Sequence, residues 1–90
     1  MYRIILHKKV TKFLKTRSAK EQNLIIGKLN QLKQNPKSNT ALDIKKMKGL
    51  ENVFRLRIGK IRIIYQVLDN ELLVLIITAG TRGDIYKGDF

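Results

Sequence analysis

Hydrophobic and polar residues alternate along residues 53–67, which is the clearest pattern in the chain. A period of two predicts β-strands, because successive side chains of a strand point to opposite faces. Gly59-Lys60 interrupts the alternation and suits a two-residue hairpin turn, so we expect Arg57 to lie directly opposite Arg62. One face of this hairpin is then apolar and ready to pack on a core: Phe54, Leu56, Ile58, Ile61, Ile63, Tyr65 and Val67.

Two helices are predicted before the hairpin. The first, residues 8–16, turns Val10, Phe13 and Leu14 inward and its lysines outward. The second begins near Ala19, because residues 18–21 fit the Ser-x-x-Glu capping box, and ends at Asn35, before Pro36. Its expected inward positions are Leu24, Ile25, Leu29 and Leu32.

The complete pattern predicts an α+β fold with the order β-α-α-β-β-β in a single domain spanning residues 1–90. The strands are expected at residues 2–6, 50–58, 61–68 and 72–78, with a loop over residues 37–48. The last strand is apolar on both faces, which predicts an interior place in the sheet. We expect an antiparallel sheet with the αα-hairpin packed on one face and the other face open.

The open face of the predicted hairpin carries Arg55, Arg57 and Arg62. Like charges opposed across strands repel, by about 0.8 kcal/mol at roughly 5 Å in water. A chain that keeps such a cluster has a use for it, and the rigid donor fork of arginine is well suited to phosphate. The cluster therefore predicts an anion site.

The chain is strongly basic, with 19 Lys and Arg against 7 Asp and Glu, a net charge of +12. This charge predicts a polyanionic partner such as RNA, DNA or an acidic protein. The absence of cysteine excludes disulfides and thiolate metal sites, and with a single histidine we expect no metal centre. No stretch is apolar enough to span a membrane, and the absence of cysteine fits an intracellular location, so we expect a cytoplasmic protein. The lysines expected to bind RNA or the ribosome are Lys8, Lys9, Lys12, Lys15, Lys45, Lys46, Lys48 and Lys60.

Three segments, in this order and spacing, resemble the RelE/ParE superfamily of toxins from type II toxin–antitoxin modules, and the RelE branch most closely. They are KMKGLENVFRLR (residues 46–57), RIIYQV (residues 62–67) and GTRGDIY (residues 80–86). The resemblance covers essentially the whole chain. It implies a RelE-like fold and a metal-independent endoribonuclease (mRNA interferase) without cofactors. Such toxins cut mRNA in the decoding site of the ribosome, by attack of a ribose 2′-hydroxyl on the adjacent phosphate, and so inhibit translation.

Carried over position by position, the catalytic residues of the family fall on Arg55, Arg57, Arg62, Arg82 and Tyr86. Arg62 and Arg82 are the expected phosphate clamp, and Tyr86 is expected to stack on a base or donate a proton. This chain departs from the best-studied RelE type, which has lysines at the positions of Arg55 and Arg57.

The departure matters because a buried lysine surrounded by cations can act as a base, whereas arginine remains protonated. The general base is therefore open. Tyr86, Lys46, Lys48, Lys60 or a group of the ribosome are the candidates that remain.

Two other functions remain as alternatives, a ParE-type inhibitor of DNA gyrase and a non-catalytic basic domain that binds nucleic acid. The resemblance also implies a cognate RelB-like antitoxin, and the basic face suits an acidic chain that folds on binding. In the inhibited state we expect a toxin–antitoxin heterotetramer or a larger complex.

Overall fold

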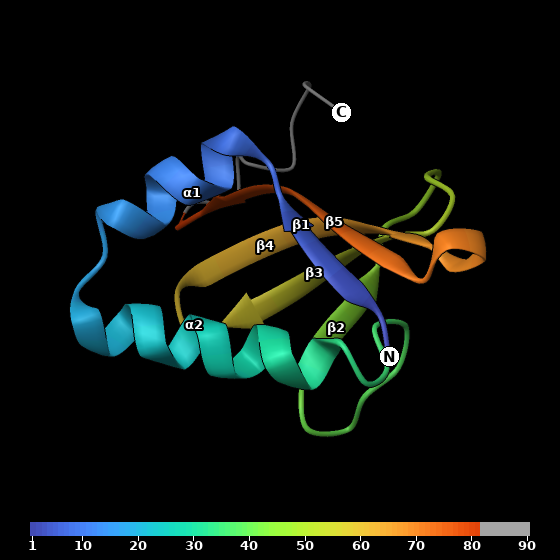
Figure 1. Ribbon diagram of the computed structural model, residues 1–90, viewed down its shortest axis with the longest axis horizontal. Helices are drawn as coiled ribbons and strands as arrows, with labels where there is room; N and C mark the ends of the chain where they lie inside the picture. The colour runs from blue at the N-terminus through green and yellow to red at the C-terminus, as the bar shows by residue number, and fades with distance from the viewer. Residues whose placement is uncertain (82–90) are drawn as a thin grey trace.

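The computed structural model describes residues 1–81, which form two helices and a five-stranded sheet (Figure 1). The elements are β1 (Arg3–Leu6), α1 (Lys8–Lys15), α2 (Ala19–Leu32), β2 (Asp43–Lys46), β3 (Val53–Ile58), β4 (Ile61–Leu68), a 3₁₀ turn (Asp69–Glu71) and β5 (Leu73–Gly80). The α+β class and the predicted order of helices and strands are confirmed, with one strand more than predicted. None of the helices in residues 1–81 is long and apolar enough to cross a bilayer.

The strands lie in the order β1-β5-β4-β3-β2, so β5 has a neighbour on each side, as its apolar composition predicts. The sheet is mixed rather than wholly antiparallel, because β1 runs parallel to β5. The prediction of an antiparallel sheet is therefore corrected at this edge. A parallel neighbour requires a crossover, which α1, α2 and the strands β2 to β4 supply between β1 and β5.

The unpredicted strand is β2, which lies within the segment expected to be a loop. Its sequence, Asp-Ile-Lys-Lys, has no strong strand propensity. It becomes a strand because it pairs with β3, with Ile44 opposite Leu56 and Lys46 opposite Phe54. The prediction of a loop was wrong here because this strand is specified by its pairing with β3 and not by a period-two pattern of its own.

The β3–β4 hairpin forms in the predicted register, with Arg57 opposite Arg62. Gly59 takes φ of 59°, the left-handed geometry required of the first turn residue. All seven residues of the predicted apolar face are buried in the core, together with Val10, three residues of α2 and two of β5.

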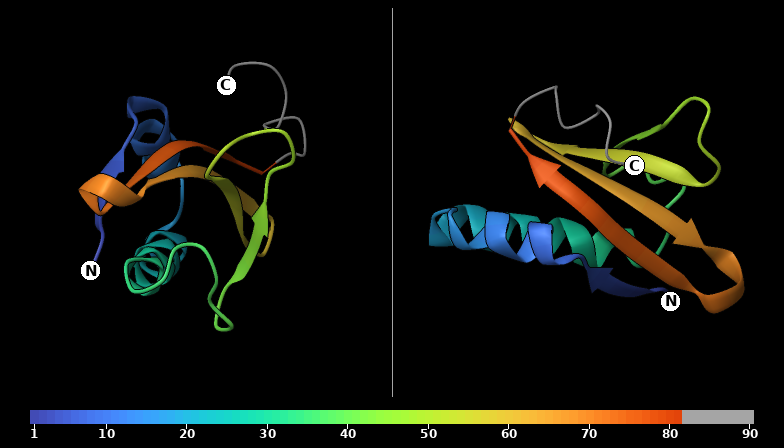
Figure 2. Two further views of the ribbon diagram at one scale, coloured as in Figure 1. Left: turned by 90° about the vertical axis from the view of Figure 1, so that its right-hand side faces the viewer. Right: turned by 90° about the horizontal axis from the view of Figure 1, so that it is seen from above.

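Both helices lie on the same side of the sheet, which curves around α2 (Figure 2). Ile25, Leu29 and Leu32 of α2 are buried, whereas Leu24 is 50% exposed, so its predicted inward orientation was wrong. The buried three follow a 4-and-3 spacing along one face, and Leu24 falls beside that face. The helix ends at Leu32, three residues before the predicted end.

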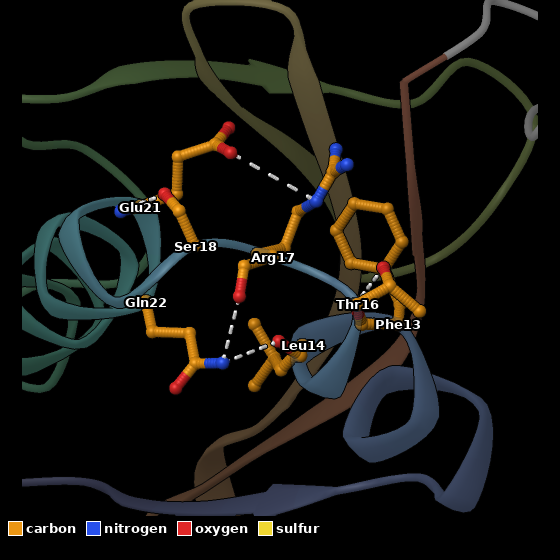
Figure 3. Close-up of polar contacts among 7 residues, drawn as sticks. All are labelled: Phe13, Leu14, Thr16, Arg17, Ser18, Glu21 and Gln22. Atoms are coloured by element: carbon orange, nitrogen blue, oxygen red, sulfur yellow. Dashed lines mark hydrogen bonds and ion pairs between the residues drawn. The ribbon is translucent and has the colours of Figure 1, made fainter.

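The junction between the helices is held by short-range polar contacts (Figure 3). The Ser18 side chain accepts a hydrogen bond from the Glu21 amide at 3.1 Å, which confirms the predicted cap. The Gln22 side chain donates to the carbonyls of Leu14 and Arg17, at 2.9 and 3.0 Å. The Arg17 guanidinium also lies over the Phe13 ring, 5.2 Å from its centroid. These contacts fix the conformation of the junction between α1 and α2.

A second polar cluster joins the chain's first residues to the β4–β5 turn. Asp69 accepts hydrogen bonds from the Tyr2 hydroxyl, at 2.7 Å, and from the Lys37 ammonium. The bond from Lys37 lowers the pKa of Asp69, and the contact with Asp69 raises the pKa of both Tyr2 and Lys37.

Replacing Asp69 with asparagine is expected to lower the melting temperature at neutral pH. Since the pKa of Asp69 is lowered on folding, its contribution to stability is present above its ordinary value of 3.8 and disappears as the pH falls through the folded value. The difference between wild type and variant should therefore close in acid. Thermal unfolding followed by circular dichroism from pH 7 to pH 2 measures it, and an equal difference at both ends would contradict the role of the carboxylate.

Candidate functional site: an arginine row across the open face

The candidate site lies on the sheet face turned away from the helices. Pairing of four strands places Asp43, Arg57, Arg62 and Gly80 in one row across the sheet. The neighbouring row is Lys45, Arg55, Ile64 and Thr78. The three predicted arginines are thus brought together, two in the first row and one in the second.

An aspartate in the first row was missed by sequence reasoning. One oxygen of Asp43 accepts from Nη2 of Arg55 at 2.7 Å, and the other accepts from Nε of Arg57 at 3.0 Å. The arginine face was expected to be purely cationic, and this carboxylate corrects that expectation. Asp43 could not be predicted because it lies in the segment expected to be a loop, and a loop has no defined strand partner.

The arginines differ in exposure. The side chain of Arg57 is 50% exposed, whereas that of Arg55 is only 15% exposed. Nε of Arg55 is buried, and no described residue accepts a hydrogen bond from it. A buried guanidinium donor is costly unless it finds an acceptor.

Arg62 lies where the register of β5 changes. Ile76 pairs with Tyr65 and Thr78 with Ile64, so Ile77 forms a bulge between them. The bulge shifts β5 by one residue, which places Gly80 rather than Ala79 opposite Arg62. Arg62 also donates from Nη1 to the Thr81 carbonyl at 3.4 Å. The end of β5 and the cluster of arginines therefore meet at Arg62.

A basic hollow of about 370 Å³ adjoins the arginines at the β2 edge of the sheet. It is lined by Lys45, Lys46, Met47, Lys48 and Arg55. Three of the predicted RNA-binding lysines thus gather beside Arg55, and none of the described lining residues carries a carboxylate. Lys60 is exposed in the hairpin turn, at the end of the sheet that Arg57 and Arg62 also occupy.

The lysines predicted on the first helix belong to a different surface. Lys8, Lys9, Lys12 and Lys15 are exposed on α1, which packs against β1 and β5 on the helix side of the sheet. His7 has a local structural task, since its ring accepts a hydrogen bond from the Lys9 amide at 3.1 Å and caps α1. The structure therefore separates the predicted lysines into two groups.

Two predicted site residues, Arg82 and Tyr86, lie outside the described residues. Within residues 1–81 no group of three or more His, Asp or Glu side chains is placed to hold a metal ion. What the described part of the site offers is three arginines on one sheet face, two of which are held by one carboxylate. That arrangement suits binding of a phosphate chain.

Comparison with known proteins places the chain in a family. A family profile described as "ParE toxin of type II toxin-antitoxin system, parDE" matches residues 4–86. The chain is 34% identical over 86 residues to the "Putative toxin RelE1" of Methanocaldococcus jannaschii, covering 96% of each protein.

Solved structures agree with this match. The RelE-RelB complex of Pyrococcus horikoshii has a TM-score of 0.80 at 26% identity, covering 91% of this chain and 96% of that one. The RelB-RelE complex of Methanococcus jannaschii has a TM-score of 0.71 at 30% identity, covering 91% and 94%. The chain therefore belongs to the ParE/RelE family of toxins of type II toxin–antitoxin systems.

Proposed function

We propose that this toxin is a ribosome-dependent endoribonuclease that cuts mRNA in the decoding site. The observation that carries the proposal is the placement of Arg55, Arg57 and Arg62 together on the sheet face turned away from the helices. These are positions at which the RelE branch has its working basic residues, and the RelE1 name of the curated relative supports the same branch.

The arginines would act on the charge of the reacting phosphate. Attack by a 2′-hydroxyl builds negative charge on the equatorial oxygens and on the leaving 5′-oxygen. Preorganised cations stabilise that charge without having to reorient. Arg62 and Arg57 face one another across the strands, so a phosphate between them would meet donors from both sides.

Proton transfer requires other groups, because arginine does not give up its proton. Lys46 and Lys48 line the hollow beside Arg55, which favours them as candidates for the general base over Lys60, in the turn. Tyr86 remains a candidate for base stacking or for donation of a proton. The mechanism needs neither a metal nor a cofactor.

The cognate partner is a RelB-like antitoxin, as in the archaeal complexes whose fold this chain shares. A toxin with a charge of +12 attracts an acidic chain, and such a chain would neutralise the arginine face. The exposed lysines of α1 would meet ribosomal RNA on the other side of the molecule. A ribosomal target also implies action in the cytoplasm.

Purified wild-type protein added to a cell-free translation system is expected to stop protein synthesis and leave mRNA cut within the codon at the decoding site. Primer extension maps the cuts. The same mRNA without ribosomes should stay intact, because the positioning of the strand is assigned to the ribosome. Intact mRNA on stalled ribosomes would refute the proposal.

Gyrase inhibition is the second candidate, since the matching family profile bears the ParE name. A supercoiling assay with purified gyrase separates the two functions. Inhibited supercoiling together with intact mRNA would establish the ParE-type activity instead.

A further inference from the structure

We propose that Asp43 is a positioning residue that orients Arg55 and Arg57 for the phosphate of the substrate. The effect that we expect on catalysis rests on the proposed function. The effect that we expect on the arginine side chains rests on geometry alone. The inference assigns a role to the first residue of the edge strand β2, which the proposed mechanism does not otherwise use.

The two contacts of Asp43 use different parts of the two guanidinium groups. On Arg57 the carboxylate accepts from Nε, the nitrogen nearest the main chain, at 3.0 Å. No residue among 1–81 accepts a hydrogen bond from the two terminal nitrogens of Arg57, whose side chain is 50% exposed. On Arg55 it accepts from Nη2 at 2.7 Å, which holds a side chain that is otherwise almost buried. A single carboxylate thus contacts both arginines without occupying the two terminal nitrogens of Arg57.

The carboxylate is itself held in place by the sheet. Asp43 is directly opposite Arg57 in the β2–β3 register, and the next residue, Ile44, packs against the hydrophobic core. A cross-strand pair of opposite charge contributes roughly 0.2–1 kcal/mol, which is modest for stability. The larger consequence of the contact is that it restricts the arginine side chain, because an arginine without the Asp43 carboxylate samples many rotamers.

The Asp43 carboxylate also offsets the repulsion between the two arginines of its row. Arg57 has Arg62 opposite it on β4 and Asp43 opposite it on β2. Without the carboxylate, Arg57 would turn away from Arg62 into solvent. With it, both arginines stay on one face at neighbouring strand positions, where one phosphate can reach both.

The catalytic test compares Asp43→Asn and Asp43→Ala with wild type in ribosome-dependent cleavage, with kcat and KM measured separately. Loss of positioning should lower kcat of Asp43→Ala by about tenfold or more. Asp43→Asn keeps one acceptor oxygen, so its kcat should fall less than that of Asp43→Ala. KM should not rise, since removal of a negative charge strengthens attraction to RNA. Glu71→Gln is the charge-matched control, because Glu71 is exposed in the β4–β5 turn, away from the row.

The structural test uses the Nε–Hε signals of the arginines in NMR spectra of the isolated toxin. In wild type the Arg57 signal should be protected from exchange with water, and Asp43→Ala should abolish that protection while the backbone spectrum shows an intact fold. This readout stands even if the protein cleaves no mRNA. Wild-type kcat in Asp43→Ala, or an Arg57 signal unchanged by the substitution, would overturn the positioning role.

A double substitution distinguishes positioning from an independent effect. If Asp43 acts through Arg57, then Asp43→Ala should reduce kcat little further in an Arg57→Ala background. Full additivity of the two losses would overturn the proposal that Asp43 acts through Arg57.

Discussion

Replacing Arg62 with alanine is expected to reduce the rate of ribosome-dependent mRNA cleavage by about 100- to 1,000-fold, the usual consequence of losing one preorganised donor from a charged transition state. Arg62 is expected to have the largest effect because it completes the row opposite Arg57 and contacts the end of β5 through Thr81. Single-turnover cleavage on programmed ribosomes measures the change directly.

Two companion variants make this result specific. Arg62→Lys keeps the charge and loses the planar set of guanidinium donors, so its activity should lie between that of Arg62→Ala and that of wild type. Arg3→Ala removes the same charge from the opposite edge strand and should leave the rate near wild type. If Arg62→Ala and Arg3→Ala lowered the cleavage rate equally, the loss of overall charge would explain the effect and the position of Arg62 would not.

Replacing Tyr65 with alanine is expected to lower the free energy of unfolding by about 3–5 kcal/mol, the usual range for a large aromatic side chain removed from a core. Tyr65 is completely buried in β4, and its ring stacks on Phe54 with centroids 5.7 Å apart. Its hydroxyl donates to the Pro36 carbonyl at 2.6 Å, which anchors the segment that leads from α2 to β2. Urea denaturation followed by circular dichroism measures the loss.

Tyr65→Phe separates the hydroxyl from the ring. It should cost about 1–3 kcal/mol, since the substitution leaves the Pro36 carbonyl without its donor. Burial raises the pKa of Tyr65 on folding, so the tyrosine contributes stability below its ordinary value of 10.0 and loses it as the pH rises further. The advantage of wild type over Tyr65→Phe should thus shrink above pH 10. An advantage that persists unchanged in alkali would contradict this origin.

Local pattern determined a large part of this protein. Strict alternation and a glycine-led turn were enough to place Arg57 opposite Arg62 and to identify the apolar face of the hairpin, because period and turn geometry are encoded within about fifteen residues of chain. The helix start at Ala19 was equally local, since Ser18 and Glu21 form the cap themselves. Family membership also came from the sequence, through segments whose order and spacing are specific.

Tertiary structure alone decided the features that depend on strand pairing with no local pattern to predict it. The short polar strand β2 has no alternation to reveal it, and it exists because β3 offers a free edge to pair with. The parallel contact of β1 with β5 joins the first strand to the last, and no local signal specifies it. Asp43 reaches Arg55 and Arg57 only through such a pairing. The sequence alone therefore placed the three arginines on one face of the hairpin, and the fold brought Asp43 into contact with two of them.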